Sequence, residues 1–192
     1  MRTLIVFESM YGNTHVVAQG IAEGLSARSE VRVVPVHDAS TDDVAWADLV
    51  IVGGPTHVHG MTSAASRKSA QDAAAKPDSD LVLDPDSEGL GLRDWFHALS
   101  PVTDKRGAAF DTRFDSAALI TGRASRGIEH RLRHGGFTLA AEPQSFLVDK
   151  KTHLLEGEAD RAKQWGTRLL ESYAWPPVST DPNFQPSVGR TP

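Results

Sequence analysis

Hydroxyl, amide and glycine residues are concentrated in one short segment near the start of the chain, where a helix is expected to begin. The residues expected to bind a ligand there are Ser9, Met10, Tyr11, Gly12, Asn13 and Thr14. Hydroxyls and the unpaired N–H groups of a helix N-terminus can hold a phosphate monoester without a fixed positive charge. The segment has neither a Gly-Lys-Ser/Thr ending nor a Gly-x-Gly-x-x-Gly turn, so a small, singly phosphorylated ligand fits better than a nucleoside triphosphate or NAD. A capped helix without a ligand would explain Asn13 and Thr14, but not the clustered hydroxyls and Gly12.

The composition limits the chemistry that the chain can perform unaided. Its 192 residues predict one domain, and 40% of them are apolar, as in an ordinary globular protein. With 20 basic and 25 acidic residues the formal charge is −5, which disfavours a general nucleic-acid binder. There is no cysteine, so thiolate metal sites, disulfides and a cysteine nucleophile are excluded. Any redox chemistry must therefore come from a bound cofactor.

The elements that must position the first segment alternate between strands and helices. Apolar, β-branched runs predict strands over Thr3–Phe7, Val31–Val36 and Asp48–Gly54, and the apolar spacing within Thr14–Leu25 predicts a helix. Pro35 places the second strand at a sheet edge, because proline has no N–H to donate. This alternation predicts an α/β fold with a parallel sheet.

The second half of the chain continues this alternation. An acidic run from Asp78 to Asp94 is interpreted as a solvated loop. The expected elements are a helix capped by Thr62 that runs to about Ala75, a helix over Leu92–Leu99, a strand over Gly107–Phe110, a helix over Ala124–His134 that ends at Gly135-Gly136, a broken strand over Phe137–Ala141 and Ser145–Val148, and a helix over Glu158–Tyr173. The expected domain spans residues 1–173, and residues 174–192 form a proline-rich tail.

The first segment also resembles a known family signature. The run from Ile5 to Thr14, followed by Ala18 and Ile21, is similar to the phosphate loop of flavodoxins, an apolar strand followed by Ser/Thr-x-x-Gly-x-Thr. The resemblance implies a three-layer α/β/α flavodoxin-like fold with a five-stranded parallel sheet in the order 2-1-3-4-5. It also implies one non-covalently bound FMN at the switch point between the first and third strands.

Two further loops extend the resemblance. The loop after the third strand is similar to the Gly-x-Pro-Thr loop that contacts the flavin ring, and the loop after the fourth strand is expected on the ring's other side. The implied cofactor-binding residues are Pro55, Thr56, His57, Val58, His59 and Gly60 in the first of these loops, and Asp111, Thr112, Arg113 and Phe114 in the second.

The sequence departs from carrier flavodoxins at the expected ring site. Their flavin is commonly sandwiched between tryptophan and tyrosine, whereas His57, His59 and Phe114 stand here. The two histidines leave a metal site open as an alternative. A guanidinium from Arg113 near the flavin would raise its potential, and a solvent-facing Arg113 or one paired with Asp111 or Asp115 is the alternative. Arg126, His130 and Arg133 share one helical face that could receive a phosphorylated nicotinamide or an acidic partner.

Three functions follow from this resemblance. The first is electron transfer through FMN to a redox partner protein or a small-molecule donor or acceptor, and the second is an NAD(P)H- or quinone-linked oxidoreductase. The third is a binding or regulatory module that has lost FMN. No nucleic-acid or membrane partner is expected, and a homodimer stays open. The resemblance and the short N-terminal apolar run imply a cytoplasmic protein.

Overall fold

The computed structural model describes residues 1–57 and 59–172. Val58 and the expected tail, residues 174–192, lie outside the described residues. The strands are β1 (Arg2–Phe7), β2 (Glu30–Pro35), β3 (Leu49–His57), β4 (Gly60–Met61), β5 (Arg106–Phe114), β6 (Thr138–Leu139) and β7 (Gln144–Val148). The helices are α1 (Asn13–Leu25), α2 (Thr41–Trp46), α3 (Ala64–Ala74), α4 (Leu92–Ala98), α5 (Ala118–Thr121), α6 (Ala124–His134) and α7 (Glu158–Ser172).

The sheet has the strand order predicted from the sequence. β2, β1, β3 and β5 lie side by side and parallel, with β2 at the edge as Pro35 requires. The fifth position is shared, because β6 pairs with the start of β5 and β7 pairs with its end. The strand is interrupted over residues 140–143, and Pro143 within this stretch has no N–H for the ladder. β4 adds a short antiparallel pairing to the end of β3, so the sheet has seven strands rather than five and is not wholly parallel.

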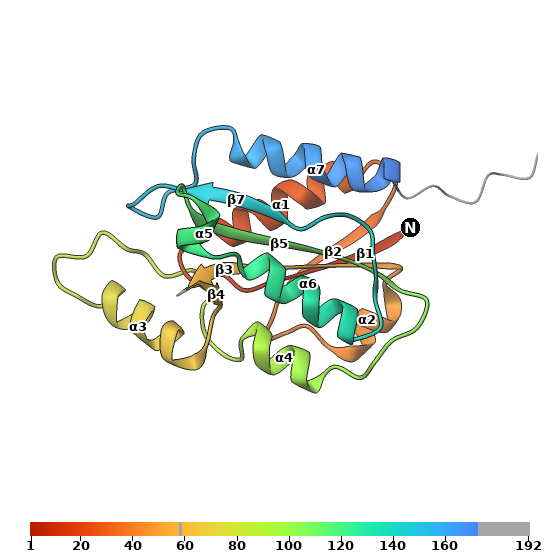
Figure 1. Ribbon diagram of the computed structural model, residues 1–192, viewed down its shortest axis with the longest axis horizontal. Coiled ribbons are helices and arrows are strands. Elements are labelled where there is room, and N and C mark those ends of the chain that lie inside the picture. Colours follow the sequence, from red (N-terminus) through yellow and green to blue (C-terminus); the bar gives the residue numbers. More distant parts are fainter. Residues whose placement is uncertain (58, 173–192) are drawn as a thin grey trace, which may run out of the picture.

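Helices cover both faces of this sheet and make three layers (Figure 1). α1 and α7 pack on one face, where the core is built from side chains such as Ile5, Ile21 and Trp165. α2, α4 and α6 pack on the other face around Val50, Trp95 and other buried side chains. The carboxyl ends of β1, β3 and β5 meet at one edge of the sheet, beside α5 and β4 (Figure 1). Among the described residues, no helix is long and apolar enough to cross a lipid bilayer.

Three local predictions were wrong. Helix α3 is capped by Ser63 rather than Thr62, because the Thr62 hydroxyl donates instead to the buried carboxylate of Glu8. The acidic run is not wholly solvated, since the Asp84 side chain is buried and its backbone N–H donates to Met10 O (2.8 Å). The stretches expected as loops at Pro55–His57 and Asp111–Phe114 are strand, because β4 and β7 supply pairing partners there.

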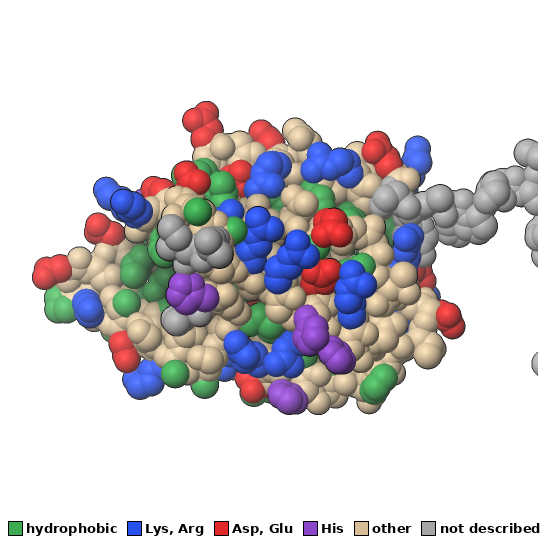
Figure 2. Space-filling model, viewed as in Figure 1, with side chains coloured by type: hydrophobic (Ala, Val, Ile, Leu, Met, Phe, Trp, Pro, Cys, Tyr) green, Lys and Arg blue, Asp and Glu red, His purple; other side chains and the backbone are tan. Residues whose placement is uncertain are grey.

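Basic and histidine side chains are concentrated on part of one face of the molecule. Figure 2 views the side of the molecule covered by α4 and α6, where Lys, Arg and His side chains gather over α6. The arginine-rich α6 begins and ends at the residues predicted from the sequence, and Gly135 follows its last turn.

Two helices that are far apart in the sequence lie in backbone contact. A Cβ built on Gly24 of α1 would lie 2.0 Å from the carbonyl oxygen of Lys163, and one on Gly166 of α7 would lie 2.3 Å from that of Ile21. Glycine at these positions allows α1 and α7 to approach more closely than any side chain would permit. Helix α1, which follows the predicted phosphate loop, is thereby held against α7, the last described helix.

We expect Gly24→Ala to lower the free energy of unfolding by about 1–3 kcal/mol, the usual cost of overpacking, despite the ~1 kcal/mol that alanine contributes to a helix interior. The matched control is Gly127→Ala in α6, where the added methyl would meet only the flexible Met61 side chain at 3.3 Å. Urea unfolding followed by far-UV circular dichroism measures both. Equal stability of the two variants would contradict this close contact of α1 and α7.

Candidate functional site

A cavity of about 330 Å³ lies at the carboxyl edge of the sheet, between the start of α1 and the ends of β3 and β5. This volume is within the range of small-ligand sites. Its wall is built by Ser9, Met10, Tyr11, Asn13, Thr14, Pro55, Thr56, His57, His59, Thr112, Arg113, Phe114, Thr121, Val148 and Thr152. All three segments predicted from the sequence contribute to it.

The N-terminus of α1 is open toward this site. A serine precedes each of helices α2 and α3 and caps its first turn through reciprocal hydrogen bonds, whereas Gly12 precedes α1 and provides no side-chain cap. Gly12 has φ +86°, a left-handed conformation that favours glycine, and its N–H donates to Ser9 Oγ (3.1 Å). The first-turn N–H groups of α1 therefore remain as donors for an anion.

Two buried hydroxyls stand beside these donors. Ser9 is fully buried, and Thr14 is 2% exposed. The Thr14 hydroxyl lies 2.8 Å from that of Thr112 on β5, so a hydrogen bond joins the first turn of α1 to this strand. Each hydroxyl of this pair can donate only one proton, so an additional acceptor in the cavity can be satisfied by one of them.

Side chains of the loop are anchored on both sides of the cavity. Asn13 Nδ2 donates to the Thr152 carbonyl (2.6 Å), and the Tyr11 hydroxyl donates to the Ala70 carbonyl on α3 (3.0 Å). Burial raises the pKa of Tyr11, which keeps the phenol protonated and able to donate. Thr152 stands in a turn with φ +64°. These contacts hold the loop open in a fixed shape.

A buried carboxylate lies directly beneath the loop. Glu8 is 4% exposed and accepts hydrogen bonds from the Thr62 hydroxyl and from the N–H of Leu92 at the start of α4 (2.9 Å). The guanidinium of Arg67 on α3 lies 3.9 Å from it. The carboxylate thus joins the end of β1 to α3 and α4, and its charge is compensated within the protein.

The two histidines of the second segment lie in different environments. His57 is part-buried and lines the cavity, and burial lowers its pKa more than the charge of Glu8 raises it, so the ring is neutral at pH 7. His59 is exposed at the cavity mouth in a left-handed conformation, φ +70°. In the described part of the chain, the group of three side chains close enough to share a metal is His15, Asp84 and Asp86, which includes neither histidine.

In the third predicted segment, Asp111–Phe114, the last three residues line the cavity and Asp111 does not. The Arg113 guanidinium is in the wall and donates to the carbonyl of Ser116 (2.6 Å), while its Nε–H is buried without a hydrogen-bond partner. Among the described residues Arg113 forms no ion pair with Asp111 or Asp115, so the pairing proposed as one part of the alternative was wrong. An unpartnered buried donor beside a cavity is an available hydrogen bond for a ligand.

Asp111 lies behind the wall rather than in it. It is fully buried and accepts from the N–H of Ser125 (2.8 Å) and from the Thr56 hydroxyl (3.2 Å), which itself accepts from the N–H of Ala124 (2.8 Å). Burial raises the pKa of Asp111, and the Ser125 N–H opposes that rise. Asp111 and Thr56 therefore cap α6 from the neighbouring strands, so its N-terminus, unlike that of α1, has protein acceptors.

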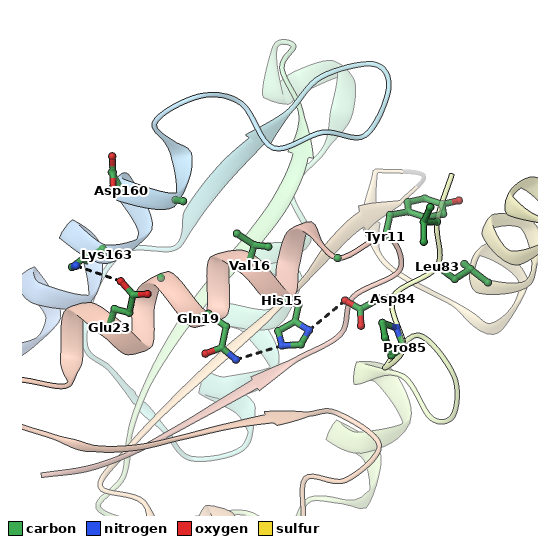
Figure 3. A pocket seen from close by; sticks show the side chains of 14 residues that line it. Tyr11, His15, Val16, Gln19, Glu23, Leu83, Asp84, Pro85, Asp160 and Lys163 are labelled. Carbon is green, nitrogen blue, oxygen red and sulfur yellow. Dashed lines mark hydrogen bonds and ion pairs between the residues drawn. The ribbon is translucent and has the colours of Figure 1, made fainter. Parts of the chain in front are cut away.

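A larger hollow of about 590 Å³ lies on the outer side of α1 (Figure 3). Its side chains already interact with one another, since Lys163 pairs with Glu23 at 3.3 Å and the His15 ring lies 3.5 Å from the Asp84 carboxylate. The His15 ring also stacks on Phe7, at 4.5 Å between centroids. These contacts attach the acidic run to α1. The ends of β3 and β5 line the smaller cavity and not this hollow.

The predicted site residues therefore fall into three groups. Most line the cavity at the strand ends. The second group lies beside the cavity: Gly12 lines the hollow on the outer side of α1, Gly60 lines a neighbouring groove, and Asp111 lies behind the cavity wall. The third is Val58, which lies outside the described residues. Sequence reasoning missed Thr121, Val148 and Thr152, which enter the wall from segments without a recognisable motif.

Comparisons with known proteins agree with this geometry. The sequence profile of the flavodoxin family, described as "Flavodoxin", matches residues 5–93. A flavodoxin from Aquifex aeolicus (strain VF5) is 41% identical over 61 residues, 30% of this chain, and the match spans 32% of that relative's length.

Solved structures extend the similarity to most of the chain. Oxidised flavodoxin 2 from Bacillus cereus aligns with a TM-score of 0.63 at 19% identity, covering 90% of this chain and 100% of that one. The rubredoxin oxygen:oxidoreductase of Desulfovibrio gigas aligns with a TM-score of 0.54 at 18% identity, over 91% of this chain and 37% of that one. At these identities the structures establish the fold. The sequence of the chain is thus similar to flavodoxins over residues 5–93, and most of its length has a flavodoxin-like fold.

Proposed function

We propose that the chain binds one FMN non-covalently in the cavity at the strand ends and transfers electrons through it. The observation that carries the proposal is the uncapped N-terminus of α1, which opens beside the buried hydroxyls of Ser9 and Thr14. A phosphate monoester would satisfy these donors without any nearby lysine. The matched relatives named flavodoxins support the same assignment.

The remaining wall residues fit a flavin ring. Pro55, His57 and His59 would border one side, and Thr112, Arg113 and Phe114 the other. A neutral His57 can stack or donate a hydrogen bond without adding charge. The unpartnered Arg113 Nε–H supplies a further donor. The flavin itself would carry the electrons, and the protein would bind it, orient it and tune its potential.

The cellular setting follows from the same proposal. An electron carrier needs a redox partner, which we place in the cytoplasm with this chain. Residues 1–173 would form the working domain, and a homodimer is compatible with it. The NAD(P)H- or quinone-linked oxidoreductase and the flavin-free module are the alternatives that the following experiments separate.

The first prediction concerns the phosphate. The purified chain, loaded with FMN and freed of excess, should show the protein-bound flavin bands near ~370 and ~450 nm. Thr14→Val should weaken FMN binding about 10- to 100-fold, because one hydrogen bond to a charged group contributes roughly 1.5–3 kcal/mol. Riboflavin, which lacks the phosphate, should bind both proteins equally. Titration by flavin fluorescence measures all four dissociation constants.

The matched control is Thr167→Val on α7, a hydroxyl that bonds to helix carbonyls away from the cavity. It should leave both flavins unaffected. A chain that retains no flavin in any of these experiments would be the flavin-free module. Equal losses of FMN and riboflavin in Thr14→Val would overturn the phosphate assignment.

The second prediction concerns the Arg113 guanidinium. Arg113→Ala should lower the two-electron midpoint potential of the bound flavin by tens of millivolts, since about 1.4 kcal/mol of charge stabilisation is roughly 30 mV. Arg113→Lys retains the positive charge and should shift the potential less. Redox titration against a reference dye measures it, with FMN affinity determined in parallel. An unchanged potential in Arg113→Ala would remove this residue from the proposed tuning.

The third prediction separates the carrier from the nicotinamide-linked enzyme. A carrier should be reduced negligibly on stopped-flow mixing with NADH or NADPH under anaerobic conditions, because a pure carrier has no site that positions a nicotinamide over the flavin. Dithionite provides the control that the same flavin can be reduced. Rapid bleaching near ~450 nm by either nucleotide would favour the oxidoreductase.

A further inference from the structure

A second concave surface adjoins the cavity and carries positive charge. We call it the α6 groove: about 500 Å³ between α6, the hairpin of β3 and β4, and the start of α4. Its ionisable lining consists of His59, Arg93, Arg123, His130, Arg131 and His134. None of its lining residues is an aspartate or glutamate. Such a surface attracts anions.

The three arginines of the groove are not neutralised by the protein. Within residues 1–57 and 59–172, none of them forms an ion pair. Arg93 donates to the carbonyls of Thr62 (2.7 Å) and Met61 (2.8 Å), and these contacts fix its guanidinium without cancelling its charge. Arg123 is exposed. The groove thus holds positive charge ready for an external anion.

Neighbouring arginines on the same helix behave differently. Arg126 and Arg133 each lie 3.1 Å from the Glu129 carboxylate, and Arg126 also approaches Glu142 at 3.7 Å. The face predicted from the spacing of Arg126, His130 and Arg133 is therefore largely compensated. The uncompensated charge lies on the side of α6 that faces β4, although the whole chain has a net charge of −5. Figure 2 shows the concentration of basic and histidine side chains over this helix.

The groove and the candidate flavin cavity meet at one residue. His59 lines both, and its strained backbone is held by a bridge to Gly122, where the chain enters α6. A molecule seated in the groove would therefore lie at the mouth of the cavity. This adjacency links binding in the groove to electron transfer from the cavity.

The lining favours a protein surface over a nucleotide. The lining residues include no phenylalanine, tyrosine or tryptophan, and the apolar side chain among them, Met61, is 6% exposed, so the groove offers mainly charge to a ligand. Spaced guanidinium groups on an open surface suit carboxylates presented by a second protein. Resting on the proposed electron transfer, we propose that the α6 groove docks the acidic face of a redox partner protein.

Binding is tested on the flavin-free chain, so that it does not depend on the flavin. The probe is a fluorescein-labelled octaglutamate peptide, followed by fluorescence anisotropy at ~20 mM salt, where screening is weak. The double variant Arg123→Gln, Arg131→Gln should bind at least tenfold more weakly, and the single Arg123→Gln at least threefold. The control is Arg28→Gln, Arg168→Gln, which removes two exposed charges from the α1 and α7 side and should change affinity less than twofold.

Each outcome of this titration decides the proposal. If the two double variants lose the same peptide affinity, the effect is one of net charge alone and the proposal for the groove is wrong. Absence of peptide binding would overturn it too, and so would tight binding of inorganic pyrophosphate or NADPH that excludes the peptide, since that outcome assigns a nucleotide site. Thermal melting of Arg123→Gln shows whether the fold is retained.

A second readout connects the groove to the flavin. In the FMN-loaded, reduced protein, oxidation by ferricyanide, a trianion, should slow several-fold between ~20 and ~500 mM salt, and several-fold in the groove double variant. Oxidation by the cationic hexaammineruthenium(III) should not slow in that variant. If the peptide binds but these rates do not respond, the groove does not serve electron transfer. If the chain binds the peptide but no FMN, the proposed function is wrong, whereas anion binding in the α6 groove is still supported.

Discussion

A single buried carboxylate organises the edge of the sheet at which the candidate site lies. Glu8 has left water at the end of β1, and a buried charge must find compensation inside the protein. It does so through Thr62, the first N–H of α4 and the guanidinium of Arg67, three partners from separate segments. The connection after β4, α3 and α4 are thus drawn toward the strand end, and His57 titrates within the field of the same charge.

Helices α1 and α6 both begin near this edge, and neither has a capping side chain at its own N-cap residue. Their first N–H groups have different partners. α6 has no capping side chain of its own, yet Thr56 and Asp111 accept its first N–H groups from β3 and β5. α1 has no comparable acceptor and directs its first turn toward the cavity. Helix dipoles favour anions at both positions. The protein supplies hydrogen-bond acceptors for the N-terminus of α6 from its own chain and leaves the N-terminus of α1 for a ligand.

The sequence predicted the fold well because the signals were local. Buried strands read as apolar runs, the glycine pair after His134 ended α6, and Pro35 placed β2 at the edge. The site was predicted less completely. Val148 and Thr152 reach the cavity through long-range pairing and a turn that carry no motif. Glu8 was not singled out in the sequence, and Asp111 was expected to bind the cofactor rather than to cap α6, because only the tertiary structure shows what surrounds these carboxylates.

The contact between α1 and α7 has a consequence for the order of folding. Contacting pairs such as Gly24 and Gly166 are separated by most of the described chain. The core between the sheet, α1 and α7 can therefore pack completely only after α7 has been synthesised. Contacts of such sequence separation slow folding, and they expose apolar surface while the chain is still being synthesised. The helix that would hold the phosphate is among the first segments made. It reaches its final packing among the last.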